Sequence, residues 1–257
     1  MKLNVIRTGT GPDVVLLHGW SMDGAIWGEF AAQLSRDHRV HALDLPGHGA
    51  SPRTQPVTLD TLAAEVASVL PDTCLLCGWS LGGMLALRLA CLHPRQVSGL
   101  VLFATTPRFC AGEDWPHGIA PAELDGFAAE LDADPTTLMA RFRASMCRGD
   151  EQERALRRRL AALPPPPADR RALHEGLDIL RNADLRAVVR EIDVPARVIH
   201  GDCDNVVPPA AGSWLAANLP HARLHRFDAC AHLPFLSRPE ASAALVRQFA
   251  GEVIPAA

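Results

Sequence analysis

The sequence lacks several features that would place it in a specialised class of protein. No stretch approaches the roughly 20 consecutive apolar residues of a membrane span, so an integral membrane helix is excluded. Residues 1–7 lack the apolar run of a signal peptide, so we expect a cytoplasmic protein. The net charge is −4, which excludes a nucleic-acid binder that relies on overall positive charge.

A disulfide framework is also missing. The seven cysteines are odd in number, and several lie inside apolar runs, as reduced buried thiols do. Cys74 and Cys77 have the spacing of a redox pair, but residues three apart in a strand point to opposite faces of the sheet. Tyrosine is absent and lysine occurs only at position 2, and no function follows from either. We expect reduced thiols in a reducing compartment.

The chain has enough apolar residues for a sizeable core, since 48% of its 257 residues are hydrophobic and 21% are charged. Continuously apolar runs of strand length are found at 14–18, 40–43, 74–77, 97–104, 196–200 and 222–227. Segments with helical spacing separate them, at 60–70, 82–92, 210–218 and 239–249. This alternation predicts an α/β fold, with a mostly parallel sheet covered by helices on both faces.

The alternation stops after residue 104. Helical patterns without a convincing strand follow at 121–131, 135–146, 151–163 and 170–180. The prolines at 164–167 cannot lie inside a helix, so they separate the last two. We therefore divide the chain into a core of residues 1–107 and 186–257 and a helical insertion of residues 108–185. An insertion between two strands lies over the strand ends, where open α/β sheets bind ligands, so we expect a lid.

A candidate nucleophile follows the predicted strand 74–77. The segment Gly78-Trp79-Ser80-Leu81-Gly82-Gly83 matches G-x-S-x-G between a strand and a helix, which is the setting that this motif requires. The sharp turn places Ser80 in a strained backbone conformation that costs roughly 1–3 kcal/mol. The N–H of Leu81 then lies at a helix N-terminus and faces developing negative charge. The other interpretation, a glycine-rich turn with a surface serine, does not explain this context.

A serine hydroxyl is a weak nucleophile, so it needs a base and a group that orients the base. The turn after strand 196–200 carries two carboxylates, Asp202 and Asp204, and His232 lies in the loop after the last strand. His200, Asp202 and Asp204 also have the spacing of metal ligands. Because Gly201 at the strand end favours a loop there, we expect no metal site. Catalysis by a serine, a histidine and an aspartate implies no cofactor either.

Together these residues resemble the α/β-hydrolase family. The order Ser80, Asp204, His232 is that of the family, and residues 44–51 match its D-x-P-G-x-G-x-S turn. The resemblance covers residues 14–107 and 186–250. It favours Asp204 over Asp202, which is then a turn residue, and it implies an oxyanion hole formed by the N–H groups of Trp20 and Leu81. An alternative role for Trp20 is packing of its ring between the insertion and the core.

A narrower resemblance points to the pimeloyl-acyl carrier protein methyl ester carboxylesterases of biotin synthesis. It rests on Trp79 before Ser80, on His18-Gly19-Trp20, and on matches at 114–116, 141–142, 154–156, 162–164, 176–180 and 184–186. The resemblance implies hydrolysis of a methyl-capped pimeloyl chain on an acyl carrier protein. No oligomerisation signal stands out in the sequence, so we expect a monomer. The resemblance also implies substrate contacts from Trp20, Ser80, Leu81, Phe142, Arg143, Ala144, Ser145, Met146 and His232.

The helical insertion is locally basic on an acidic protein. Residues 141–171 contain nine arginines and four acids. Arginine pairs well with carboxylates and phosphates, and acyl carrier proteins are acidic. The narrower resemblance places arginines of the insertion against the carrier, and it implies a docking surface at Arg141, Arg154, Arg157 and Arg158, although Thr137 stands where it implies another arginine. The alternative is a solvated helix face without a partner.

Other functions remain open at this point. The same serine, histidine and aspartate would serve a small-ester carboxylesterase, a thioesterase or a C–C hydrolase. A dehalogenase or epoxide hydrolase is disfavoured, because those relatives carry an aspartate where this chain has Ser80. From a different class, a hydrolase fold can also be retained as a non-catalytic receptor for a small molecule.

Overall fold

The computed structural model describes residues 3–164 and 167–254. Its centre is a seven-stranded sheet in the order β1-β3-β2-β4-β5-β6-β7, in which only β1 runs antiparallel to its neighbour. The strands are β1 Val5–Thr8, β2 Asp13–Leu17, β3 Arg39–Leu43, β4 Cys74–Trp79, β5 Val97–Phe103, β6 Ala196–Gly201 and β7 Ala222–Phe227. The predicted α/β class is confirmed.

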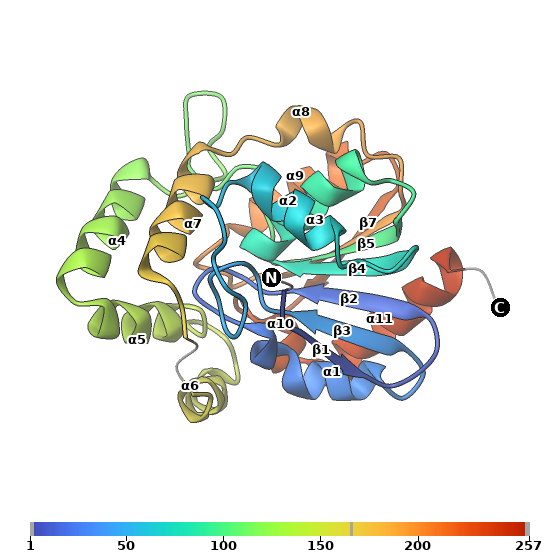
Figure 1. Cartoon of the computed structure of the whole chain (residues 1–257). Coiled ribbons are helices and arrows are strands. Elements are labelled where there is room, and N and C mark those ends of the chain that lie inside the picture. The colour runs from blue at the N-terminus through green and yellow to red at the C-terminus, as the bar shows by residue number, and fades with distance from the viewer. Residues whose placement is uncertain (1–2, 165–166, 255–257) are drawn as a thin grey trace.

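Helices cover both faces of this sheet (Figure 1). The 3-10 turn η1 (Gly24–Trp27), α1 (Gly28–Leu34) and α11 (Pro239–Val253) lie on one side, and α1 packs against α11. The other side carries α2 (Leu59–Ala67), α3 (Leu81–Leu92), α8 (Arg186–Val189) and α9 (Pro209–Asn218), and the short α10 (Pro234–Ser237) precedes α11. Because both faces are covered, β4 is buried along its whole length, as the continuously apolar run predicts.

An aromatic cluster packs beneath the carboxyl ends of the central strands. Trp27 and Phe235 have ring centroids 4.2 Å apart, and Phe30 and Phe103 complete the cluster. Trp79, at the end of β4, joins it through Phe235 at 5.4 Å. Each such pair stabilises the fold by about 0.5–1.5 kcal/mol beyond its burial. The end of β4 is therefore held in a rigid environment.

The helical insertion contains α4 (Pro121–Ala133), α5 (Pro135–Ser145), α6 (Glu153–Ala162) and α7 (Arg170–Asn182). These four helices lie together at one edge of the core in Figure 1. Asp134 caps α5 through the N–H of Thr137 at 3.0 Å, and Asp169 caps α7 in the same manner. Of the proline run at 164–167, residues 165 and 166 lie outside the described residues.

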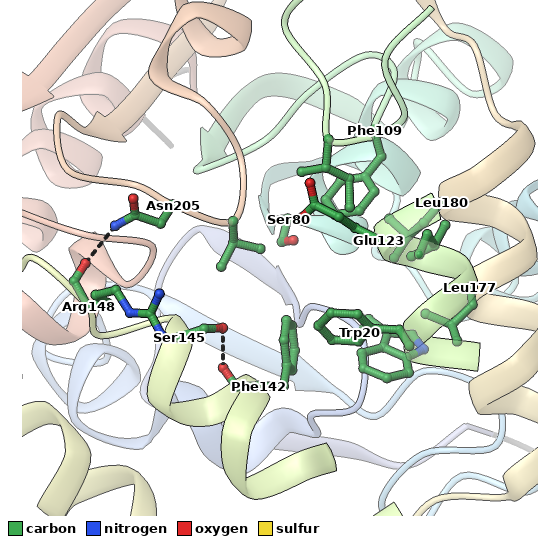
Figure 2. Close-up of a pocket in the computed structure, with 14 residues that line it drawn as sticks. Trp20, Ser80, Phe109, Glu123, Phe142, Ser145, Arg148, Leu177, Leu180 and Asn205 are labelled. Atoms are coloured by element: carbon green, nitrogen blue, oxygen red, sulfur yellow. Dashed lines mark hydrogen bonds between the residues drawn. The ribbon is translucent and has the colours of Figure 1, made fainter. Parts of the chain in front are cut away.

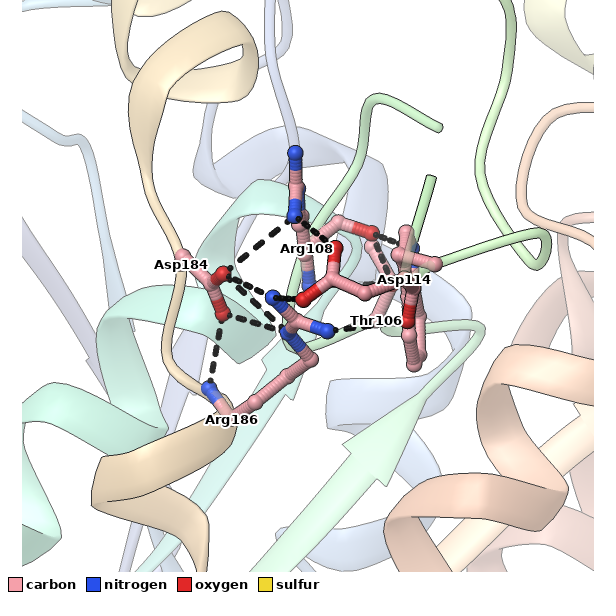
Figure 3. A network of polar contacts seen from close by, with 6 residues as sticks. Thr106, Arg108, Asp114, Asp184 and Arg186 are labelled. Carbon is pink, nitrogen blue, oxygen red and sulfur yellow. Dashed lines mark hydrogen bonds and ion pairs between the residues drawn. The ribbon is translucent and has the colours of Figure 1, made fainter. Parts of the chain in front are cut away.

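A network of two arginines and two aspartates joins the points where the chain leaves the core and returns to it (Figure 3). Arg186 pairs with Asp114 at 2.8 Å and with Asp184 at 2.6 Å, and Arg108 pairs with Asp114 at 3.1 Å. The hydrogen bonds from Arg186 lower the pKa of both aspartates. The guanidinium of Arg186 also lies 5.7 Å from the centre of the Trp115 ring. The two ends of the helical insertion are thereby held together.

The sequence-based prediction misses strand β1 and helix α1, together with the short elements η1, α8 and α10. Strand β1 has no buried face, because Val5 is half-buried and the following residues are exposed, so neither alternation nor an apolar run marks it. Helix α1 spans only Gly28–Leu34, which is too short for a helical period to stand out. The predicted helices differ from the observed ones by a few residues at their ends. Within the described chain, no helix is both long and apolar enough to cross a bilayer.

Candidate active site

Ser80 lies at a sharp turn between β4 and α3. Its backbone has φ 55° and ψ −119°, so the strained conformation predicted for this serine is observed. A Cβ atom on Gly78 would collide with the carbonyl oxygen of Gly82, and one on Gly82 would collide with the carbonyl oxygen of Leu17. Thr105 supports the turn, because its hydroxyl donates to the Ser80 carbonyl at 3.1 Å. The glycines of the motif are therefore required by close packing of the backbone.

Asp204 and His232 form a buried hydrogen-bonded pair. The imidazole Nδ1 lies 2.8 Å from Asp204 Oδ2, and the other carboxylate oxygen accepts from the N–H groups of Val206 and Val207 at 2.8 and 2.9 Å. Burial alone would raise the pKa of Asp204. The charges and hydrogen bonds of His232 and His200 outweigh burial and hold this pKa well below its usual range. Asp204 is therefore ionised at neutral pH and fixes the orientation of the His232 ring.

His200 is a second partner of Asp204 that the sequence did not reveal. Its Nε2 lies 3.2 Å from Asp204 Oδ2 and 3.0 Å from the carbonyl oxygen of Val207. Asp202, by contrast, is exposed, and its carboxylate accepts a long 3.4 Å hydrogen bond from Cys230 N–H. Among the described residues, no group of three or more His, Cys, Asp or Glu side chains could hold a metal ion.

The His232 ring lies beside the turn that carries Ser80. Trp79, the residue before Ser80, donates from its indole N–H to the His232 carbonyl at 2.9 Å, and the two rings are 5.4 Å apart. With the proton on Nδ1 for Asp204, the Nε2 atom is an acceptor. This Nε2 is buried and has no hydrogen-bond partner in the part of the chain that the structure describes. The ring can therefore accept a proton from a group brought to that nitrogen.

A cavity of about 200 Å³ opens above Ser80 (Figure 2). Its walls are mostly apolar and come from the core and from α4, α5 and α7, and they include Trp20, Phe109, Leu124, Phe127, Phe142, Leu177, Leu180 and Val206. Glu123, Arg148 and Asn205 provide polar groups, and Asn205 donates to the Arg148 carbonyl at 2.9 Å. The cavity suits an apolar chain with a polar end.

The predicted substrate contacts divide between different surroundings. Phe142 and Ser145 both line the cavity above Ser80, because residues three apart share one face of α5. Arg143 and Ala144 point elsewhere and line a separate hollow between α5 and α6. Met146 is buried and faces neither space.

Trp20 connects the core to the helical insertion. Its indole N–H donates to the carbonyl oxygen of Leu173 in α7 at 2.8 Å, and its ring lies 5.3 Å from that of Phe142. Gly176 permits this approach, since a Cβ there would lie 2.6 Å from the indole. The ring therefore packs in the interface between insertion and core. The backbone N–H groups of Trp20 and Leu81 make no hydrogen bond within residues 3–164 and 167–254, which leaves both able to donate.

The four arginines predicted to dock a carrier are exposed on α5 and α6, but their charges are not equally available. Arg141 forms an ion pair with Glu130, and Arg157 forms one with Glu153 at 2.8 Å. Arg154 and Arg158 are one helical turn apart on α6, and neither has an ion-pair partner among the described residues. These two present the more available positive charge.

His18 supports the loop that carries Trp20. Its Nε2 accepts from Leu45 N–H at 2.9 Å, and its Nδ1 lies 2.8 Å from the Gly19 carbonyl, a pair of contacts that suits the neutral ring. Burial, with a contribution from His48, lowers the pKa of His18 to about 3. His18 therefore has a structural role in this loop.

We expect this neutral histidine to make the fold sensitive to acid. Below pH 6.5 the His18 side chain is protonated in the unfolded chain but stays neutral in the folded chain. The free energy of unfolding therefore falls as the pH is lowered from 6.5 toward 3. Between pH 7.5 and 5.0 the loss from His18 is about 2 kcal/mol. Urea unfolding at the two pH values measures it, and His18→Gln should show a smaller decline. Burial also lowers the pKa of His48, so some decline remains in the variant. An equal decline in both proteins would contradict the assignment.

Comparison with known proteins agrees with this geometry. A family model described as the alpha/beta hydrolase family matches residues 14–245, and the chain belongs to that family. An esterase from Exiguobacterium antarcticum superposes with a TM-score of 0.87 at 22% identity, covering 96% of this chain and 94% of that one, which shows the shared fold.

Within the family, the chain is similar to relatives named pimeloyl-[acyl-carrier protein] methyl ester esterase. The one from Nitrosomonas europaea is 42% identical over 244 residues, which cover 93% of this chain and 96% of the relative. The one from Aeromonas hydrophila is 40% identical over 257 residues, which cover 98% and 100%.

Proposed function

We propose that the protein is a serine carboxylesterase that hydrolyses the methyl ester of pimeloyl-acyl carrier protein in biotin biosynthesis. The products are methanol and free pimeloyl-acyl carrier protein. The observation that carries the proposal is the buried Asp204–His232 pair beside Ser80 at an apolar cavity. The substrate is supported by the name of the relatives, which are about 40% identical over nearly the whole chain.

In the proposed mechanism, the Ser80 hydroxyl attacks the ester carbonyl carbon while His232 Nε2 takes its proton. Asp204 holds the imidazole and stabilises the imidazolium. The N–H groups of Trp20 and Leu81 donate to the oxyanion of the tetrahedral intermediate. His232 then protonates the departing methanol. Water activated by the same histidine attacks the acyl-enzyme and releases the acid.

The walls of the cavity account for the acyl chain in this proposal. A methyl-capped pimeloyl chain is uncharged, so it loses little on leaving water for the surroundings of Phe127, Phe142 and Leu177. The helical insertion, residues 108–185, serves as the lid that closes over this chain. The proposal includes a monomer in the cytoplasm and requires neither a metal ion nor an organic cofactor.

The carrier protein is proposed to dock on α6. Acyl carrier proteins are acidic, and Arg154 and Arg158 present available positive charge at one exposed face. Arg141 and Arg157 lie nearby and can exchange Glu130 and Glu153 for acidic groups of the carrier.

The experiment that tests the proposal compares two substrates in steady state. We expect kcat/KM for methyl pimeloyl-carrier protein to exceed that for p-nitrophenyl butyrate by at least about 100-fold, because remote binding energy from the carrier adds to that from the acyl chain. If only the small ester is hydrolysed, the protein is an esterase, but the proposed substrate is wrong. Tight binding of an ester without turnover of either substrate would support a receptor.

Charge reversal separates carrier docking from the chemistry. Arg154→Glu with Arg158→Glu should raise KM for the carrier ester about 10-fold or more, since rim charges act on encounter and orientation. The kcat/KM for p-nitrophenyl butyrate should not change. Arg190→Glu, on the core side of the molecule, is the matched control. An equal loss on both esters would assign the two arginines to folding.

A further inference from the structure

Asp150 is a buried carboxylate in the segment that joins α5 to α6. Its Oδ2 accepts from the backbone N–H of Ala231 at 2.9 Å. Its Oδ1 accepts from the Ser237 hydroxyl and from Gln152 N–H, both at 2.8 Å. Both carboxylate oxygens are therefore occupied, and two of the three donors belong to the loop and short helix around His232.

The neighbours of Asp150 make the same connection. The Met146 carbonyl accepts from His232 N–H at 3.2 Å, and Glu151 N–H donates to the Ala229 carbonyl at 2.9 Å. The side chain of Gln152 donates to the Ser237 carbonyl at 2.8 Å. Residues 146–152 of the helical insertion thus run alongside residues 229–237 of the core and bond to them repeatedly.

The His232 main chain is held from two sides. The Trp79 indole binds its carbonyl oxygen, and the insertion binds its N–H. The residue before it, Ala231, is fixed by Asp150. Ala229 lies two residues further back with φ 48°, a conformation that costs a non-glycine residue energy and persists only when its surroundings hold it. The backbone N–H of Glu151, next to Asp150, supplies part of that restraint through the Ala229 carbonyl.

We propose that Asp150 is a positioning residue for His232, which ties the helical insertion to the loop that carries the base. The inference rests on the proposed role of His232. Without the Asp150 carboxylate, Ala231 N–H and the Ser237 hydroxyl lose their buried acceptor, and the loop relaxes away from Ser80. A displacement of about 1 Å at a catalytic group can lower the rate about 100-fold. Movement of the insertion is transmitted to His232 by the same contacts.

The test uses a fluorophosphonate, which reports on Ser80 and His232 without any carrier protein. The Ser80 oxygen forms a bond to phosphorus, fluoride leaves with the P–F bonding pair, and His232 accepts the serine proton. We expect Asp150→Ala to be labelled to full stoichiometry but with a rate constant about 100-fold lower. Asp150→Asn, which keeps one acceptor oxygen, should lose about 10-fold. Asp178→Asn is the matched control, because this acid of α7 is exposed and its side chain makes no hydrogen bond or ion pair among the described residues.

The labelling experiment distinguishes a positioning role of Asp150 from a role in folding alone. Partial stoichiometry with a normal rate per labelled site would assign Asp150 to folding alone, and an unchanged rate at full stoichiometry would remove any role. Wild-type protein that is labelled but leaves the carrier ester intact would refute the proposed substrate and keep the inference. Wild-type protein that resists labelling would overturn both.

Discussion

Replacement of Ser80 by alanine is expected to lower kcat for ester hydrolysis about a million-fold, as loss of the nucleophile does in serine hydrolases. The hydroxyl is the only group of the protein that forms a covalent bond to the acyl carbon in the proposed mechanism. The measurement is single-turnover hydrolysis of p-nitrophenyl butyrate, with mass spectrometry of the acyl-enzyme in wild-type protein.

The control for this variant is its stability. Alanine keeps the positive φ of position 80 and makes the same backbone hydrogen bonds, so the urea midpoint should stay close to that of the wild-type protein. A variant that is folded and retains more than a few per cent of the activity would place the nucleophile elsewhere. A variant that is unfolded would be replaced by Ser80→Cys, which tests the position with a different nucleophile.

Replacement of Asp204 by asparagine is expected to lower kcat about 10⁴-fold, because an amide no longer selects the Nδ1–H tautomer or stabilises the imidazolium. The same substitution would leave His200 without its carboxylate partner at 3.2 Å. The rate of p-nitrophenyl butyrate hydrolysis between pH 6 and 9 measures the effect.

Asp202→Asn is the matched control, since it removes the same charge two residues away. Asp202 is exposed and does not contact His232 among the described residues, so we expect the rate to stay within about twofold of the wild-type value, as for an ordinary surface substitution. A large loss from Asp202→Asn with little from Asp204→Asn would reverse the assignment of the acid.

The sequence by itself determined those features of the fold that depend on residues close together in the chain. Six of the seven strands were predicted, and five of them, β2 to β6, are buried along most of their length and are largely apolar in sequence. The turn at Ser80 was predicted because strand, glycines and helix follow one another directly, and only small residues fit where backbones meet. The edge strand β1 was not predicted, because it buries no face and its sequence therefore shows no periodic pattern of apolar residues.

Only the tertiary structure decided which distant groups meet. Asp150 lies 81 residues from Ala231, and no local pattern distinguishes a carboxylate that will be buried from one that stays in water. His200 lies only four residues before Asp204, but it is the turn after β6 that brings the carboxylate back to its ring. Likewise, the sequence shows a basic insertion, but which arginines keep an available charge depends on whether an acid such as Glu130 lies within reach. Contacts between segments far apart in the chain arise from packing of the whole fold, and local sequence does not encode them.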